Sequence, residues 1–153
     1  MDTELNTSAM EADIDPELPA SMRFAIMAAR ELTDRKCENA TVLDVRGLSQ
    51  VCDFVVVATG TSDRQAKSAG HYVEDLGKAL GFEKLASDAD AQTKWVVVDF
   101  ASVMVHVFEP ATRAHYDLEM LWGDAVRVPW RRPANERGVG GAELRRGTLG
   151  DAG

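Results

Sequence analysis

The chain has 153 residues, 45% hydrophobic and 27% charged, which excludes a wholly disordered, collagen-like or disulfide-rich protein and favours one globular domain. The formal net charge of −8 disfavours a phosphate-neutralising surface. We therefore expect little direct nucleic-acid binding by the folded domain and a protein partner with a basic face. Because the longest apolar runs are far shorter than the roughly 20 residues of a membrane-spanning helix, we expect no membrane association. Two cysteines are too few for a disulfide framework, and we expect a cytoplasmic protein.

The two ends of the chain differ in composition from its middle. Residues 1–17 carry six acidic side chains and no basic one, and they hold too few large apolar residues to offset the entropy of ordering. From about residue 131 the chain is rich in glycine and arginine, a composition typical of a flexible segment. We therefore expect an acidic disordered tail over residues 1–17, one domain over 18–130 and a Gly/Arg-rich flexible tail over 131–153.

Helix and strand patterns alternate between these tails. Apolar residues at helical spacing predict a first helix over about 20–37. Runs of β-branched residues then predict strands over 41–45 and 53–59. Ser62 and Gln65 have the spacing of a capping box, so a second helix should begin there, and Gly81 should end it in a left-handed cap.

The sequence predicts a hairpin followed by short helical segments in the last part of the domain. A polar loop over 87–93 precedes predicted strands over 95–100 and 103–108. Pro110 suits the first position of a short helix to about Tyr116, and residues 118–122 have the pattern of a final helical turn. The order helix, strand, strand, helix, strand, strand, helix predicts an α/β fold with a mixed β-sheet flanked by helices.

Motifs for nucleotide, metal or nucleophilic chemistry are absent or weak. Neither common phosphate-binding glycine loop occurs, and the histidines and cysteines share no ligand spacing. We therefore expect no catalytic residue, no metal and no cofactor. The junction 60–62 could offer backbone donors to an anion, although a glycine turn followed by a helix cap explains the same residues. Asp99 and Glu109 flank the predicted hairpin and stay open as an acidic pair.

Alternation along the second strand of the hairpin separates two faces. The three valines of residues 103–107 should pack against helices. Met104, His106 and Phe108 form a large, half-polar face with the composition that interface centres favour. His106 has a second interpretation, as a buried side chain satisfied by a neighbouring group, and Phe108 has one as a core residue.

Three aromatic residues gather in the same third of the sequence. Trp95, Tyr116 and Trp122 belong to residue types that are enriched at binding hot spots, because they bury much area for little lost rotamer freedom. The alternative is that they only pack the core or seal the end of the domain. The sequence by itself does not separate these two roles.

Three ordered blocks of the chain resemble signatures of the ribosomal silencing factor family, also called Iojap. The first is ATGTSDRQAK at residues 58–67, the second is the long segment 95–125, and the third is LDVRGLS at residues 43–49. The resemblance runs over residues 21–130. It departs from the family pattern at the hairpin turn, where Ala101 stands in place of a usual glycine.

The resemblance implies a non-enzymatic repressor of translation. Family members bind the large ribosomal subunit through large-subunit protein fourteen and sterically block joining of the small subunit, and their fold is similar to that of nucleotidyltransferases. We expect the contacts to that partner to come from Trp95, Asp99, His106, Phe108, Glu109, Arg113, Tyr116, Asp117, Leu118 and Trp122.

Two alternative functions are also compatible with the sequence. One is a metal-dependent nucleotidyltransferase-like enzyme that uses residues 60–62 with Asp99, suggested only by the loop and by the fold analogy. The other is a homodimeric ribosome-assembly adaptor, since exposed strand edges can pair with a second copy. The homodimer can coexist with the ribosome-binding role.

Overall fold

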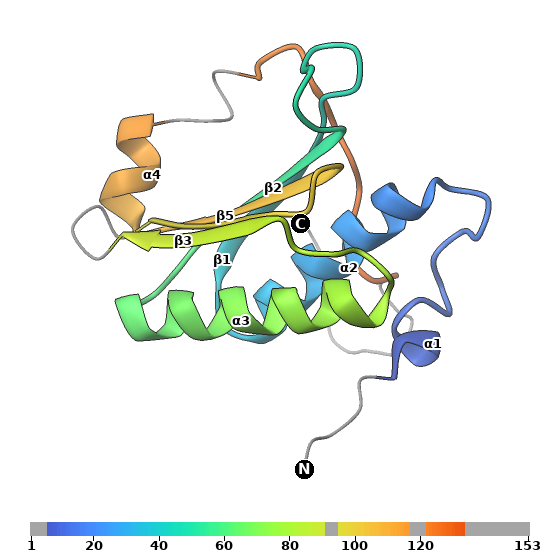
Figure 1. Ribbon diagram of the computed structural model, residues 1–153, viewed down its shortest axis with the longest axis horizontal. Helices are drawn as coiled ribbons and strands as arrows, with labels where there is room; N and C mark the ends of the chain where they lie inside the picture. Colours follow the sequence, from blue (N-terminus) through green and yellow to red (C-terminus); the bar gives the residue numbers. More distant parts are fainter. Residues whose placement is uncertain (1–5, 91–94, 117–121, 134–153) are drawn as a thin grey trace, which may run out of the picture.

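A computed structural model describes residues 6–90, 95–116 and 122–133, which form a mixed α/β fold and confirm the predicted fold class (Figure 1). Six strands make one sheet in the order β3-β4-β5-β2-β1-β6. β2 and β5 are parallel at its centre, and the other neighbouring strands are antiparallel. The strands are β1 Glu38–Asp44, β2 Phe54–Thr59, β3 Ala86–Asp90, β4 Trp95–Asp99, β5 Val103–Phe108 and β6 Val126–Arg127. The helices are α1 Thr7–Met10, α2 Ala20–Asp34, α3 Asp63–Ala79 and α4 Pro110–Tyr116.

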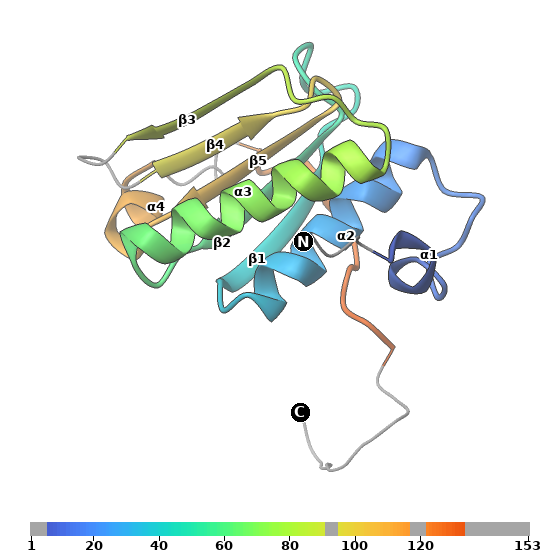
Figure 2. The same cartoon turned by 60° about the horizontal axis from the view of Figure 1, so that its bottom comes forward.

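The two long helices cover the same side of the sheet. α2 and α3 lie side by side beneath the strands, and the short α4 stands on the other side at one end of the sheet (Figures 1 and 2). One face of the sheet is therefore covered by the two long helices, and the opposite face carries α4 at one end.

Among the described residues, no helix combines the length and the apolar character that crossing a membrane requires.

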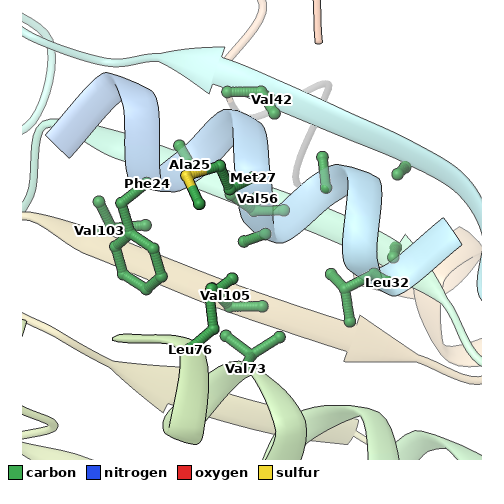
Figure 3. Packing of buried hydrophobic residues seen from close by; sticks show 14 of the residues in the cluster. Phe24, Ala25, Met27, Leu32, Val42, Val56, Val73, Leu76, Val103 and Val105 are labelled. Atoms are coloured by element: carbon green, nitrogen blue, oxygen red, sulfur yellow. The ribbon is translucent and has the colours of Figure 1, made fainter. Parts of the chain in front are cut away.

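The core lies between the sheet and the two long helices. Phe24 and Leu76 reach from α2 and α3 toward the valines of β5, as Figure 3 shows. Val103, Val105 and Val107 are all 0% exposed, so the predicted valine face is confirmed. We call this side of the sheet the helix face, and it contains the cluster Phe24, Ala25, Met27, Leu32, Val42, Val56, Val73, Leu76, Val96, Val98, Phe100, Val103, Val105 and Val107.

Glycines let α3 approach the sheet closely. A Cβ atom added at Gly77 would lie 2.5 Å from Cε1 of Phe100, and one at Gly70 would lie 2.9 Å from Cγ1 of Val96. Real Cβ atoms do not come this near to ring or methyl carbons, so any side chain at Gly77 would push the helix from the sheet. The small residues of α3 thus set the spacing between the two layers.

Both ends of α3 match the sequence prediction. Ser62 Oγ accepts from the Gln65 backbone N–H at 3.1 Å, and Gln65 Oε1 accepts from the Thr61 N–H at 3.0 Å. Gly81 follows the helix with a φ of 87°, a left-handed conformation that costs glycine little. The junction 60–62 therefore forms the glycine turn and helix cap that the sequence analysis gave as the alternative to an anion site.

The structure contains a strand where the sequence analysis expected a loop. Residues 86–90 pair with β4 along their whole length as the edge strand β3, although residues 87–93 were predicted to be a polar loop. The segment Ala-Ser-Asp-Ala-Asp has none of the apolar alternation that marks a strand, because an edge strand with exposed side chains needs no such pattern. β6 and α1 were also not predicted, and each is a short element.

Segments from both ends of the chain meet on α2. Arg30 is 5% exposed, and its Nη1 donates to Asp13 Oδ1 at 2.9 Å while its Nε donates to the Trp130 carbonyl at 2.6 Å. Ile14 belongs to the core and is 6% exposed. Residues 6–17, expected to be a disordered tail, thus contact the domain, because Arg30 offers a buried partner to Asp13. Residues 1–5 and 134–153 lie outside the described residues.

Candidate functional site

The side of the sheet away from α2 and α3 carries a second, smaller apolar cluster, and we call it the Trp95 face. Alternation along β4 and β5 directs Trp95, Met104, His106 and Phe108 to this side, which confirms the predicted separation of the two faces. Its buried part is Leu43, Val45, Cys52, Val55, Val57 and Phe108, and its half-buried part is Trp95, Met104, Trp122 and Ala125.

Trp95 and His106 form a polar pair at the centre of this face. The residues are neighbours on β4 and β5, and the Trp95 Nε1–H donates to His106 Nδ1 at 3.1 Å. An indole nitrogen can only donate, so His106 must accept at Nδ1 and carry its proton on Nε2. His106 is 8% exposed, and burial lowers its pKa from 6.5 to about 4. The imidazole is therefore neutral near pH 7 and acts as an acceptor that holds the indole.

The Phe108 ring packs against the Trp95 indole. The centroids of the Phe108 and Trp95 rings lie 4.7 Å apart, and the His106 and Phe108 rings stack at 5.9 Å. Phe108 is 0% exposed, so a partner has no surface of this ring to touch. The arrangement gives His106 and Phe108 the role of positioning Trp95, whose own side chain is half-buried.

Trp122, which comes after α4 in the chain, packs against the same cluster. Its side chain is half-buried and packs on the Trp95 face together with Ala125, and the Ala125 N–H donates to the Trp122 carbonyl at 2.8 Å. The sequence predicts two alternative roles for Trp122, as a core residue or as a contact surface. The structure gives it both an inner, packed side and an outer, exposed side.

Arg113 links α4 to the neighbouring ends of β1 and β2. Its Nη1 donates to the Asn39 carbonyl at 2.7 Å and to Thr59 Oγ1 at 2.8 Å, and its Nη2 donates to Thr41 Oγ1 at 3.4 Å. Glu109 is exposed immediately before α4. Tyr116 is the last residue of α4, whereas Asp117 and Leu118 lie outside the described residues.

Asp99 lies away from the other expected contact residues. The register pairs Trp95 with Phe108 at one end of the hairpin and Asp99 with Met104 at the other. Asp99 Oδ1 accepts from the Ala101 N–H at 2.8 Å, so the carboxylate holds the hairpin turn. The structure thus brings Trp95, His106, Phe108 and Trp122 into one cluster and does not bring Asp99 into it.

The acidic pair and the nucleotidyltransferase arrangement are not assembled. Asp99 and Glu109 occupy opposite ends of the hairpin. Residues 60–62 follow β2 at the end that pairs with Phe108, so the glycine turn is also at the end of the sheet remote from Asp99. Within the described ranges, no three carboxylate, histidine or cysteine groups come together as metal ligands. Both cysteines are free and buried, and burial raises the pKa of each thiol.

A basic segment that starts in β6, at residues 127–131, also belongs to the surface of the domain and was not predicted as a site. Arg127, Trp130 and Arg131 line a cavity of about 550 Å³ beside β1. Residue 131 had been placed in the expected flexible tail, and the alternation of Val126, Val128 and Trp130 was the available signal for an ordered strand there. The pairing of β6 with β1 needs only two residues, which is below the length at which such a pattern is distinctive.

Comparison with known proteins identifies relatives over most of the chain. The sequence model described as "Ribosomal silencing factor during starvation" matches residues 19–145. The protein named "Ribosomal silencing factor RsfS" of Halalkalibacterium halodurans is 34% identical, over 67% of this chain and 87% of the relative. "Protein Iojap, chloroplastic" of Zea mays is 33% identical, over 78% of this chain and 50% of the relative.

Solved structures agree with this likeness. A crystal structure of a Chromobacterium violaceum protein has a TM-score of 0.63 and 32% identity, covering 76% of this chain and 92% of that one. A crystal structure of a Bacillus halodurans protein has a TM-score of 0.57 and 30% identity, covering 71% of this chain and 95% of that one. The fold and the sequence therefore point to the same group of proteins.

Proposed function

The chain belongs to the ribosomal silencing factor family, and from that membership we propose that it represses translation by binding the large ribosomal subunit through large-subunit protein fourteen. Bound at that place, the domain would stand where the small subunit docks and prevent joining by its bulk. A folded domain of about 100 residues has a radius of gyration near 13 Å, which is large enough to occupy one bridge between the subunits. The role is that of a regulator in the cytoplasm and needs no catalytic group.

The observation that carries the proposal is the half-buried aromatic surface of the Trp95 face. Trp95 is fixed by the hydrogen bond to His106, and Trp122 lies on the same cluster. Rigid aromatic side chains that are packed on one side and exposed on the other are typical hot-spot residues, because binding costs them little entropy. We infer that Trp95, Tyr116 and Trp122 contact the partner, while Arg113, whose guanidinium is bound to β1 and β2, positions α4. Contacts from Glu109, Asp117 and Leu118 stay predictions.

Charge supports a basic protein partner. The chain has 25 acidic and 17 basic residues. Ribosomal proteins are commonly rich in basic residues, so an acidic domain is attracted to them, and such complementarity speeds the encounter more than it tightens the complex. The acidic composition therefore favours the proposed partner without choosing the contact residues.

The test is sedimentation of purified ribosomal subunits through sucrose gradients with the protein added. We expect the protein to migrate with the large subunit and to lower the yield of joined ribosomes. A Trp122→Ala or Tyr116→Ala protein should bind at least about 30-fold more weakly, since truncating a hot-spot residue costs about 2 kcal/mol or more.

A matched aromatic truncation controls for this experiment. Tyr72→Ala removes a half-buried ring from α3, on the other side of the molecule, where the ring contacts Arg35. This variant should bind the large subunit like the unmodified protein. Normal binding by a folded Trp122→Ala protein would contradict the assigned face, and co-migration without a joining defect would contradict the occlusion mechanism.

The homodimeric adaptor receives less support from the structure. β3 is an edge strand, which could in principle pair with a second copy. Its sequence carries Asp88 and Asp90, and like charges on an edge oppose self-pairing. Light scattering that gives a monomer across micromolar concentrations would remove this alternative.

A further inference from the structure

An open cavity of about 550 Å³ lies on the β1 side of the sheet. Its lining comes from β1, from residues 127–131 and from Arg113 of α4. The aliphatic lining residues Ala40, Val42 and Val128 are all buried. The surface that a ligand would meet therefore belongs mainly to Asn39, Thr41, Arg113, Arg127, Trp130 and Arg131.

The cavity exists because the chain after β6 leaves the regular strand ladder. The Val128 N–H still donates to the Val42 carbonyl at 2.9 Å. The next hydrogen bond along β1 comes from a side chain, since Trp130 Nε1–H donates to the Ala40 carbonyl at 3.1 Å. β1 itself changes register here, and Asn39 has a φ of 53°. A side chain thus replaces the backbone of a paired strand, and open space remains beside it.

The cavity concentrates positive charge without a carboxylate in its lining. Arg113 is held in place by its hydrogen bonds to β1 and β2. Arg127 and Arg131 are exposed, and within the part of the chain that the structure describes neither forms an ion pair with a carboxylate.

Two exposed arginines outside the cavity are paired with carboxylates instead. Arg46 pairs with Asp44 at 2.7 Å, and Arg132 pairs with Asp34 at 2.9 Å. By contrast, the Arg131 guanidinium lies 4.7 Å from the centroid of the Trp130 ring. Stacking of this kind holds a guanidinium in place while its in-plane N–H groups stay available to an acceptor. The guanidinium groups of Arg127 and Arg131 therefore offer N–H donors to a ligand in the cavity.

We propose that this cavity binds the phosphodiester backbone of RNA, with Arg127 and Arg131 donating to phosphate oxygens. Guanidinium groups match the geometry of phosphate, and a phosphate chain needs an open, polar surface rather than an enclosed apolar pocket. A free nucleoside triphosphate fits less well, because it is carried with a divalent cation and the lining offers no carboxylate to hold one.

The net charge of the chain does not oppose this site. Six of the acidic residues lie within residues 1–17, and none lines the cavity. Binding to phosphate depends on the local cations, since each phosphate that is neutralised releases counterions. The expectation of little nucleic-acid binding rests on summed charge, whereas this surface is locally basic. The site would add an RNA contact to the protein contact of the proposed function.

The test measures binding of the full chain to a fluorescein-labelled RNA of 20 nucleotides by anisotropy, at several salt concentrations. We expect binding that weakens as salt rises, and an R127Q/R131Q protein that binds at least tenfold more weakly. The slope of log K against log salt should fall in magnitude by about 1 to 2 in this variant, because two phosphate contacts are lost.

A charge-matched variant is the control. R46Q/R132Q removes the same net charge from arginines that are paired with Asp44 and Asp34 outside the cavity, and it should bind RNA like the unmodified protein. Equal weakening by both double variants, or no RNA binding by the unmodified protein, would overturn the proposal. Displacement of the RNA by GTP at an equal concentration of phosphate groups would assign the cavity to a free nucleotide and would also overturn it.

Failure of this proposal can be told apart from failure of the proposed function. A Trp122→Ala protein should lose affinity for large subunits and keep its affinity for the RNA oligonucleotide. The R127Q/R131Q protein should bind the RNA at least tenfold more weakly, and its binding to large subunits should become less sensitive to salt. Loss of both activities in both variants would contradict two separate surfaces and leave this inference refuted.

Discussion

The two faces of the sheet are built from the same strands and have different chemistry. The helix face is closed by α2 and α3, and its valines on β5 are fully buried. The Trp95 face contains a hydrogen-bonded Trp95–His106 pair and half-buried aromatic side chains. One face thus contains most of the buried apolar residues, while the other keeps polar and exposed groups that a closed core would not need.

The largest expected effect is loss of stability on the helix face. Phe24 is 0% exposed and its ring centroid lies 4.7 Å from Phe82 and 4.8 Å from Phe100. Phe24→Ala should lower the free energy of unfolding by about 3 to 5 kcal/mol, because it removes buried ring area and leaves a cavity. Urea denaturation followed by circular dichroism measures the loss.

Trp122→Ala provides the comparison on the other face. Since Trp122 is only half-buried, its removal should cost clearly less stability than that of Phe24, while it should weaken binding to the large subunit. Equal losses of stability in the two variants would mean that the Trp95 face is a second closed core rather than a binding surface.

The next effect concerns pH and depends on His106. Burial lowers its pKa from 6.5 to about 4, so the unfolded chain takes up a proton more readily than the folded one. The folded state is therefore fully stable above about pH 6.5 and loses stability as the pH falls from there toward 4. Between pH 7 and pH 5 the expected loss from this one group is about 2 kcal/mol.

His106→Gln is the variant that isolates this effect. The Gln side chain can still accept the Trp95 N–H, but it does not titrate, so the decline in stability from pH 7 to 5 should become shallower by about 2 kcal/mol. The measurement is urea denaturation at each pH. Parallel curves for the unmodified and His106→Gln proteins would show that the imidazole is not buried in solution.

How far the sequence predicts these faces depends on the strength of the local pattern. The valine alternation of β5, the capping box at Ser62 and the left-handed Gly81 each have a short-range physical cause and were predicted correctly. β3 was missed because its stability comes from pairing with β4, a contact between segments that the residues of β3 do not encode.

The same distinction explains the outcome for the candidate site. Composition indicated that the Met, His and Phe side of β5 was unusual, but burial of Phe108 under Trp95 depends on strand register. Asp99 was grouped with the contact residues by the resemblance, and its use in the turn depends on backbone geometry. The cavity between residues 127–131 and β1 depends on a contact across about half of the chain, and the short alternation of Val126, Val128 and Trp130 does not predict it.

The smallest expected effect is at the turn that joins the strands of both faces. Ala101 has a φ of 70°, and the Ser102 N–H donates to the Phe100 carbonyl at 2.8 Å, the hydrogen bond of a tight three-residue γ-turn. A left-handed alanine costs roughly 1 to 2 kcal/mol, and glycine relieves this strain while gaining entropy in the unfolded chain. Ala101→Gly should therefore raise the free energy of unfolding by about 1 kcal/mol or less, as measured by urea denaturation.

A second Ala→Gly substitution, expected to lower the free energy of unfolding, serves as the control for this small increase. Ala79→Gly, at an exposed position in the last turn of α3, should lower stability by up to about 1 kcal/mol, since glycine is a poor helix former. Because β4 and β5 carry side chains of both faces, the stabilised turn should leave the Trp95–His106 pair and binding to the large subunit unchanged. A destabilised Ala101→Gly protein would show that Asp99 holds the turn only when its central residue has a side chain.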